Sequence, residues 1–357
     1  MPTLDPLASS ARTPWTPTAG SGGPVPSPAG SIPSVGAAGP RPDVSYDAAV
    51  TRLRVPPLDL GAIVARMDPV ATKLDQAKAA ASGPYTVNGA TVTSGAQFRI
   101  ANGWNEANVE THGGILMSAA RSVGVAGPQV MLLTEGRGDS ASLTKLTQAL
   151  IDAGQLPQGS KAPIADQIHD LQWRFGIGMD CAGYVYRALA TVHGDLSKLG
   201  LKSSDYENFT GLVSNPHFTQ CSPSEARAGD VIVLQGSPTD PHDPGHNLIV
   251  RSHASLSPIL DPALTTDRNA HDFAFDSNGT MKPGIQVFEV DSSFGAGTEG
   301  DVSGGVRRDI LLYNPNAKAP EAQWCTCKST TPPLTSLDRV PYREHALTGF
   351  FRAKVTP

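Results

Sequence analysis

Hydrophobic positions along this chain repeat at two periods, one typical of helices and one typical of strands. A stripe of leucine and isoleucine side chains, three or four residues apart, predicts a helix over 142–151. Patterns of the same kind predict helices over 106–123 and 162–175. A further helix is expected to start near Cys181, because the apolar residues that follow it recur at helical spacing.

Strand signals lie on both sides of these helices. Asn88-Gly89 separates two β-branched runs within residues 85–93, which predicts a hairpin because this dipeptide supplies the positive φ angles of a two-residue turn. Short β-rich runs follow the Cys181 helix. The fold class expected from this order is α+β, with the nucleophile helix described below packed on an antiparallel sheet. The runs are 231–234, 246–251, 285–291, 306–313 and 347–355.

Three regions are expected along the chain. Residues 1–43 hold ten of the 31 prolines, mostly between small residues, which predicts a disordered Pro/Gly/Ser-rich tail. This tail is interpreted as a linker or as an address for an export or injection apparatus. Residues 44–155 form an N-terminal mixed hairpin and helical region. Residues 156–357 carry the candidate chemistry.

Charge and composition exclude several classes of protein. The net charge of −5 gives no electrostatic grip on nucleic acid. No stretch approaches the ~20 apolar residues that span a membrane, and the N-terminus does not resemble a secretory signal. These features fit a protein that is secreted or delivered by a non-classical route. The alternative is a cytoplasmic protein. The four cysteines do not form a disulfide framework, and Cys221, Cys325 and Cys327 are interpreted as core residues, with a surface thiol pair or disulfide as the alternative for the last two.

The strongest chemical signal is Cys181, which lies where a glycine-rich turn meets a helix. Unpaired backbone N–H groups and the helix dipole stabilise a thiolate there, so the pKa of the thiol is expected to be lowered. The same N–H groups are suited to hold an oxyanion. Asp180 precedes the thiol, and the small side chains of Ala182 and Gly183 are expected to leave its approach open.

A thiol nucleophile needs a base, and His246 opens a predicted strand 65 residues later (246 − 181). The imidazole needs a third polar group to orient it. Asp291, at the end of the run 285–291, is the preferred candidate. Ser292 points to the opposite face and takes its place if the register differs by one residue. His253 lies too far along the same strand.

Other polar and aromatic residues have structural and functional interpretations. Trp173 and Tyr184 either line a substrate groove or belong to the core. His242, Asp243 and His246 share a proline-rich loop that is a second-choice metal site, but the prolines forbid the helix that would align the two histidines. No metal and no cofactor is predicted.

Three short motifs carry a family resemblance. Phe-Gly-Ile-Gly-Met-Asp-Cys-Ala-Gly-Tyr-Val from Phe175, Ala-Gly-Asp-Val-Ile-Val from Ala228 and Gly-His-Asn-Leu-Ile-Val from Gly245 resemble, in order, the elements of the NlpC/P60 superfamily of papain-like peptidases and amidases. The resemblance covers roughly residues 160–300. It implies a papain-like domain in which Cys181 is the nucleophile and His246 the base. Asn247 and the leucine after it depart from the family's usual Val-Gly.

The function expected from these features is cleavage of an amide or peptide bond by a Cys181–His246–Asp291 triad. The resemblance implies bacterial peptidoglycan peptides as substrates, and the lack of a signal peptide suggests an exported effector or toxin. Two alternatives stay open. One is an acyltransferase, deamidase or transglutaminase-type toxin that uses the same chemistry on a protein. The other is a non-catalytic binding module, which predicts a buried Cys181.

Overall fold

We describe a computed structural model of the 357-residue chain. The described residues all belong to one unit, Asp59–Pro357. The tail predicted over 1–43 and the first part of the region 44–155 lie outside them. The structure describes residues 68–98, 103–157, 159–196, 214–236, 245–254, 273–278, 280–294, 304–319, 323–328 and 346–354.

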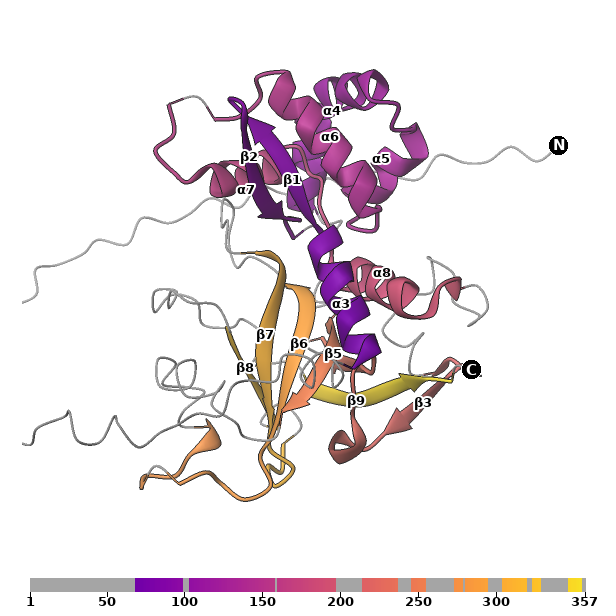
Figure 1. The fold of residues 1–357 in the computed structure, drawn as a ribbon, viewed down its shortest axis with the longest axis vertical. Helices are drawn as coiled ribbons and strands as arrows, with labels where there is room; N and C mark the ends of the chain where they lie inside the picture. The colour runs from indigo at the N-terminus through magenta and orange to yellow at the C-terminus, as the bar shows by residue number, and fades with distance from the viewer. Residues whose placement is uncertain are drawn as a thin grey trace, which may run out of the picture. The chain divides into compact units, whose positions relative to one another are not determined.

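The described fold is α+β, as the sequence predicts (Figure 1). A two-stranded hairpin precedes most of the helices, and a seven-stranded antiparallel sheet follows them in the order β3-β9-β4-β5-β6-β7-β8. The helices are α3 (Pro69–Ala80), α4 (Gly103–Ser122), α5 (Gly127–Thr134), α6 (Ser140–Asp152), α7 (Ile164–Arg174) and α8 (Cys181–His193), and a 3-10 turn spans Pro223–Glu225. The strands are β1 (Ser82–Val87), β2 (Ala90–Gly95), β3 (Phe218–Cys221), β4 (Val231–Gln235), β5 (His246–Ala254), β6 (Gln286–Phe294), β7 (Gly305–Tyr313), β8 (Trp324–Lys328) and β9 (Ala346–Ala353).

Local sequence explains where several of these elements begin and turn. Asn88 and Gly89 have φ angles of 50° and 78°, as a tight hairpin turn between β1 and β2 requires. Aspartates precede three helices and accept hydrogen bonds from backbone N–H groups of the first turn: Asp68 for α3, Asp139 for α6 and Asp180 for α8. Each cap satisfies a donor that has no partner within its own helix.

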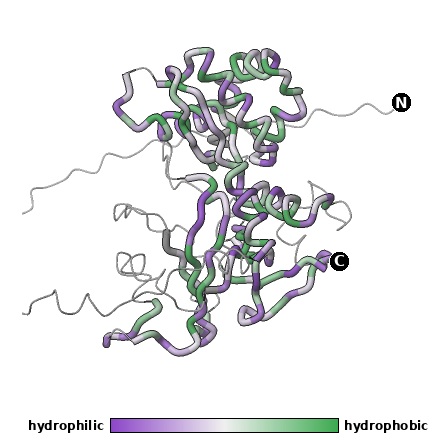
Figure 2. The backbone as a smooth tube through the Cα atoms, in the orientation of Figure 1, coloured by the Kyte–Doolittle hydropathy of each residue, from purple (hydrophilic) through white to green (hydrophobic). Residues whose placement is uncertain are grey.

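The sheet separates two hydrophobic clusters. On one face, Val233 of β4 and Ile249 of β5 join the largest cluster, together with the apolar side of α8. On the other face, Leu234 and Leu248 join a second cluster with Phe294 of β6. Figure 2 shows the hydrophobic stretches along the tube, including the change along β7 from a hydrophilic segment to a hydrophobic one. Alternation along the strands therefore decides which side chains meet α8.

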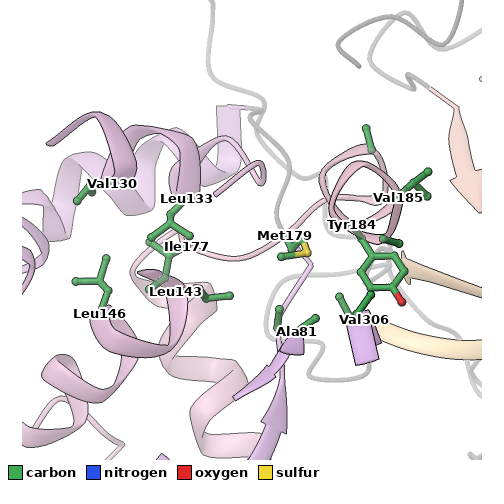
Figure 3. Packing of buried hydrophobic residues seen from close by; sticks show 14 of the residues in the cluster. Ala81, Val130, Leu133, Leu143, Leu146, Ile177, Met179, Tyr184, Val185 and Val306 are labelled. Atoms are coloured by element: carbon green, nitrogen blue, oxygen red, sulfur yellow. The ribbon is translucent and has the colours of Figure 1, made fainter. Parts of the chain in front are cut away.

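The largest cluster draws side chains from both sides of residue 155, where the sequence separates two regions. Leu133 and Leu143 come from α5 and α6, while Tyr184 comes from α8. Figure 3 shows Met179, just before α8, between these groups. No helix among the described residues is long and apolar enough to cross a membrane.

The first turn of α8 lies against the loop that follows α5. The backbone N–H of Asp180 donates to the carbonyl oxygen of Gly136 at 2.8 Å. A Cβ atom at Gly183 would lie only 2.2 Å from that same oxygen. Gly183 is therefore required for close approach of the loop, and the loop covers the helix start instead of leaving it open.

Replacing Gly183 by Ala should destabilise the protein by about 1–3 kcal/mol, because the added methyl group overpacks against backbone that cannot rotate away. Gly114 in α4 is the matched control, since a Cβ there meets nothing within 4 Å. Gly114→Ala should stabilise by about 0.5–1 kcal/mol through helix propensity. Urea denaturation measures both values, and equal effects of the two variants would contradict the packing argument.

Candidate functional site

Cys181 is the first residue of α8 and is only 6% exposed. Its neighbours before the helix are fixed by two backbone hydrogen bonds: Asp180 N–H donates to Gly136, and Met179 N–H donates to the carbonyl of Gln97 at 2.9 Å. The Asp180 carboxylate accepts from the Gly183 N–H and closes the first turn. These contacts hold the thiol in place while they bury it.

The strands below the helix start form a fork. The described pairing of β5 with β6 begins at Ile249 and Asp291 and runs away from residues 246–248. At the open end, the Ser292 hydroxyl donates to the Asn247 carbonyl at 2.6 Å. The Ser293 hydroxyl donates to the Met179 carbonyl, also at 2.6 Å. Side chains of β6 thus bind both β5 and the segment leading into α8.

The Cys181 thiol completes this arrangement. The backbone N–H of Asn247 hydrogen-bonds to it, as do the N–H groups of Ala182 and of Cys181 itself. The Cys181 sulfur therefore accepts a hydrogen bond from a backbone N–H of β5 that a carbonyl of a neighbouring strand would otherwise accept. The structure thus brings Cys181 to the start of the strand that His246 opens.

The pKa of this thiol is raised to about 12, whereas the sequence predicts a lowered value. Burial is the main cause, and the negative charge of Asp180 adds to it. Hydrogen bonds from the backbone N–H groups act in the opposite direction but are weaker. The expectation was wrong because it considered the helix start, which lowers the thiol pKa, but not the covering loop, which buries the thiol and raises its pKa. At rest the sulfur is a thiol, not a thiolate.

Asp180 is also affected by burial. Loss of solvent raises its pKa to about 7, against the lowering effects of the Gly183 N–H and of the charge of Arg137. Near neutral pH this carboxyl is therefore present in both protonation states. The charge that Asp180 places beside the thiol changes over the same pH range.

His246 is buried, with 2% of its surface exposed, and pairs with Leu234 of β4. Its ring lies 5.1 Å from the ring of Phe294, tilted by 40°. Strand alternation places this side chain with Leu234 and Leu248, while Asn247 shares the face of Ile249 and α8. The imidazole thus lies beside the fork, against Phe294.

Asp291 is not brought to His246, contrary to the proposed triad. It pairs with Ile249, three residues and so about 10 Å further along β5. Its carboxylate is fully buried and accepts two hydrogen bonds from Arg308, at 2.7 and 2.8 Å. Arg308 also donates to Asp75 of α3 at 2.7 Å. Asp291 therefore belongs to an ion-pair cluster that joins α3 to β6 and β7.

The two alternatives for the third position are engaged elsewhere. Ser292 donates to the Asn247 carbonyl and so fixes the backbone next to His246. His253 is exposed and stacks on Phe288 with ring centroids 4.6 Å apart. The His246 ring packs against Phe294.

The structure also places the two aromatic candidates for a substrate groove. Tyr184 is buried in the largest cluster, so its ring belongs to the core (Figure 3). Burial raises the pKa of its phenol, and the charge of Asp291 adds to this. Trp173 is half-buried near the end of α7, and its carbonyl accepts from Asn108 at 3.0 Å.

Asn247 is the polar residue that sequence reasoning missed. It appeared in the sequence only as a departure from the usual motif. Its side chain is 1% exposed and lies on the α8 face of the sheet. The signal that would have found it is alternation with Ile249, whose side chain packs under α8.

The remaining cysteines and the second-choice metal loop lie outside this arrangement. Cys221 lies 3.7 Å from a carboxylate oxygen of Asp230, and its pKa is raised to about 11 by partial burial and by that charge. Cys325 is half-buried in β8. His242, Asp243 and the side chain of Cys327 lie outside the described residues. Within the described ranges, no three metal-ligating side chains gather in one place.

Comparisons with protein-family models, curated proteins and solved structures found no match to this chain.

Replacing Arg308 by Met should destabilise the protein by about 3–5 kcal/mol, because Asp291 is left buried without its partner. Adding Asp291→Asn should restore part of this loss. Arg174→Met, at a half-exposed pair with Asp170, is the control and should cost about 1 kcal/mol or less. Urea denaturation at neutral pH gives the unfolding free energies of the wild type and the three variants. A loss no larger than the control would mean that the cluster carries no structural role.

Replacing Asp180 by Asn should remove a pH dependence of stability. The carboxyl binds its proton more tightly in the folded chain, with a pKa of about 7 against an ordinary 3.8. The resulting stabilisation is complete below the ordinary pKa and is lost as pH rises through 7. Asn keeps the helix cap, so the unfolding free energy of the wild type should fall relative to Asp180→Asn between these pH values and level off above.

The same variant should raise the rate at which iodoacetamide labels Cys181 at pH 8, because the charge that raises the thiol pKa is gone. Labelling of Cys221 serves as the internal reference. An unchanged Cys181 rate, or parallel stability curves for the two proteins, would contradict this assignment.

Proposed function

We propose that this chain is a cysteine-dependent hydrolase of amide or peptide bonds, with a papain-like domain of the NlpC/P60 type. The observation that carries the proposal is the hydrogen bond from the Asn247 backbone N–H to the Cys181 thiol. It joins a cysteine at a helix start to the strand opened by His246. Nucleophilic catalysis by a thiol needs a base such as this histidine near the sulfur.

The backbone of His246 lies close to the sulfur. The Asn247 nitrogen is bonded to the carbonyl carbon of His246, so a thiol hydrogen-bonded to it lies within about 6 Å of the His246 Cα. The proposal requires the imidazole, which packs against Phe294 in this structure, to turn toward Cys181 during the reaction. The proposed catalytic pair is a dyad, since Asp291 is held by Arg308.

The reaction follows from these groups. His246 takes the thiol proton as the sulfur attacks the carbonyl carbon, and an S–C bond forms. His246 then gives this proton to the leaving nitrogen as the C–N bond breaks, which leaves a thioester. A water molecule, deprotonated by His246, attacks the thioester carbon, and the thiol is regenerated as the carboxylic acid leaves.

The raised pKa of Cys181 assigns the first step to general-base catalysis. A thiol with a pKa of about 12 holds its proton at neutral pH, so proton transfer to His246 must accompany attack. Peptidoglycan stem peptides are the proposed substrate, on the strength of the motif resemblance. Export as an effector or toxin belongs to the same proposal and rests on the Pro-rich N-terminal sequence.

Burial of Cys181 favours a second candidate, a binding module without catalysis. With 6% exposure and three backbone donors, the thiol serves well as a structural acceptor. Acyl transfer to, or deamidation of, a protein is a variant of the first candidate that uses the same dyad.

Cys181→Ala should lower cleavage of purified peptidoglycan fragments at least about 10³-fold, because the nucleophile is lost, and His246→Gln should do the same. Mass spectrometry of the fragments measures the loss, and Cys221→Ala and Cys325→Ala are the controls. Both controls should keep full activity.

A wild-type protein that cleaves nothing, and whose Cys181 is alkylated no faster than Cys221 and Cys325, would favour the binding module. Mass changes on protein substrates in place of peptidoglycan would favour acyl transfer or deamidation.

A further inference from the structure

The side chain of Asn247 holds a buried acceptor beside the nucleophile. Its Oδ1 atom is buried and accepts no hydrogen bond from the residues that the structure describes. Buried carbonyl oxygens are nearly always paired, and leaving one unpaired costs roughly 1–3 kcal/mol. An unpaired polar atom at this position is therefore a sign of use by something that binds here.

The position of Asn247 ties its side chain to the thiol. The pair with Val233 places it on the face of the sheet that packs under α8. The backbone N–H of the same residue hydrogen-bonds to Cys181. The Ser292 hydroxyl holds its carbonyl at 2.6 Å, so the residue is fixed from the strand side. Its side-chain amide thus belongs to a residue whose backbone is fixed beside the sulfur, on the face that packs under α8.

The other polar side chains described at the fork are already engaged. Ser292 and Ser293 donate to the backbone carbonyls of Asn247 and Met179. Asp291 is paired with Arg308. The Asn247 side chain, in contrast, has an acceptor available to a ligand.

Resting on the proposed function, we propose that Asn247 Oδ1 accepts a hydrogen bond from the N–H of the scissile amide. In an amide, this N–H is attached to the carbonyl carbon that the thiol attacks. An acceptor fixed beside the sulfur therefore meets the N–H when the carbonyl is in place for attack. An ester has no such donor, and neither has a tertiary amide such as the bond preceding proline.

This contact selects the substrate class. A site built to pair with a substrate N–H rejects an analogue that lacks it, because the protein group then stays buried and unpaired. The chain is thus a hydrolase of primary or secondary amides, and Asn247 is a specificity-determining residue of the dyad.

The test compares two substrates that differ in one atom. Mass spectrometry first locates the bond cleaved in a synthetic peptidoglycan stem peptide. A depsipeptide is then made in which ester oxygen replaces the scissile nitrogen. The quantity measured is the ratio of kcat/KM for the peptide to kcat/KM for the depsipeptide, so intrinsic differences in reactivity cancel between variants.

Asn247→Leu, which keeps the size of the side chain but not the acceptor, should lower this ratio about 10- to 30-fold relative to wild type, chiefly through the peptide. Asn247→Asp keeps an acceptor and should hold the ratio near its wild-type value even as both rates fall. Thr326→Val in β8 is the matched control, since the Thr326 hydroxyl is also buried without a described partner, and it should change neither rate.

An Asn247→Leu protein in which both rates fall equally, or an Asn247→Asp protein in which the ratio collapses as in Asn247→Leu, would overturn the proposal. Thermal unfolding shows that each variant is folded before its rates are compared. Failure of the proposed function is separate: Cys181→Ala would then leave cleavage of both substrates unchanged.

Discussion

The arrangement of this site depends on one hydrogen bond, from a backbone N–H of β5 to the sulfur of Cys181. The first residues of β5 pair with β4 on one edge, but the described pairing with β6 begins only at Ile249, so the edge that faces β6 needs other partners. The helix start supplies one through the thiol, and β6 supplies another through the Ser292 hydroxyl. Burial of polar backbone is tolerated only when it is paired, so the fork and the helix start stabilise each other.

Burial raises the pKa of three acidic groups, Asp180, Cys181 and Asp291, but their partners differ. At Cys181 the charge of Asp180 adds to the effect of burial. Deeper along β6, Asp291 is equally buried but has the guanidinium of Arg308, whose own pKa is raised by the pair. The Asp291 carboxylate therefore joins a hydrogen-bonded ion pair. The Asp180 carboxyl, beside the candidate nucleophile, accepts from the Gly183 N–H instead, and its pKa is about 7.

Local pattern predicted much of this fold. The helices around 142–151, 162–175 and after Cys181 carry clear apolar stripes, and Asn88-Gly89 fixed the first hairpin. The alanine-rich α3 and the short α5 gave no comparable signal. What could not be predicted is non-local: β9 lies between β3 and β4, Arg308 of β7 pairs with Asp291 on the neighbouring strand β6, and the Gly136 loop covers Gly183. Asp291 was preferred for the triad because it is a carboxylate at the end of a predicted strand. Its distance from His246 depends on strand register, which sequence does not determine.

The proposed catalysis and the resting structure make conflicting demands on the Cys181 sulfur, and the fork suggests how they are reconciled. As long as the sulfur is a thiol, the N–H groups of Asn247, Ala182 and Cys181 are directed at it. When the sulfur bonds to a carbonyl carbon, negative charge moves to the carbonyl oxygen, one bond away. Donors that held the sulfur then lie beside the charge that develops, without a change of backbone. On this argument, the contacts that keep the resting thiol protonated and buried are those that stabilise the oxyanion once attack has begun.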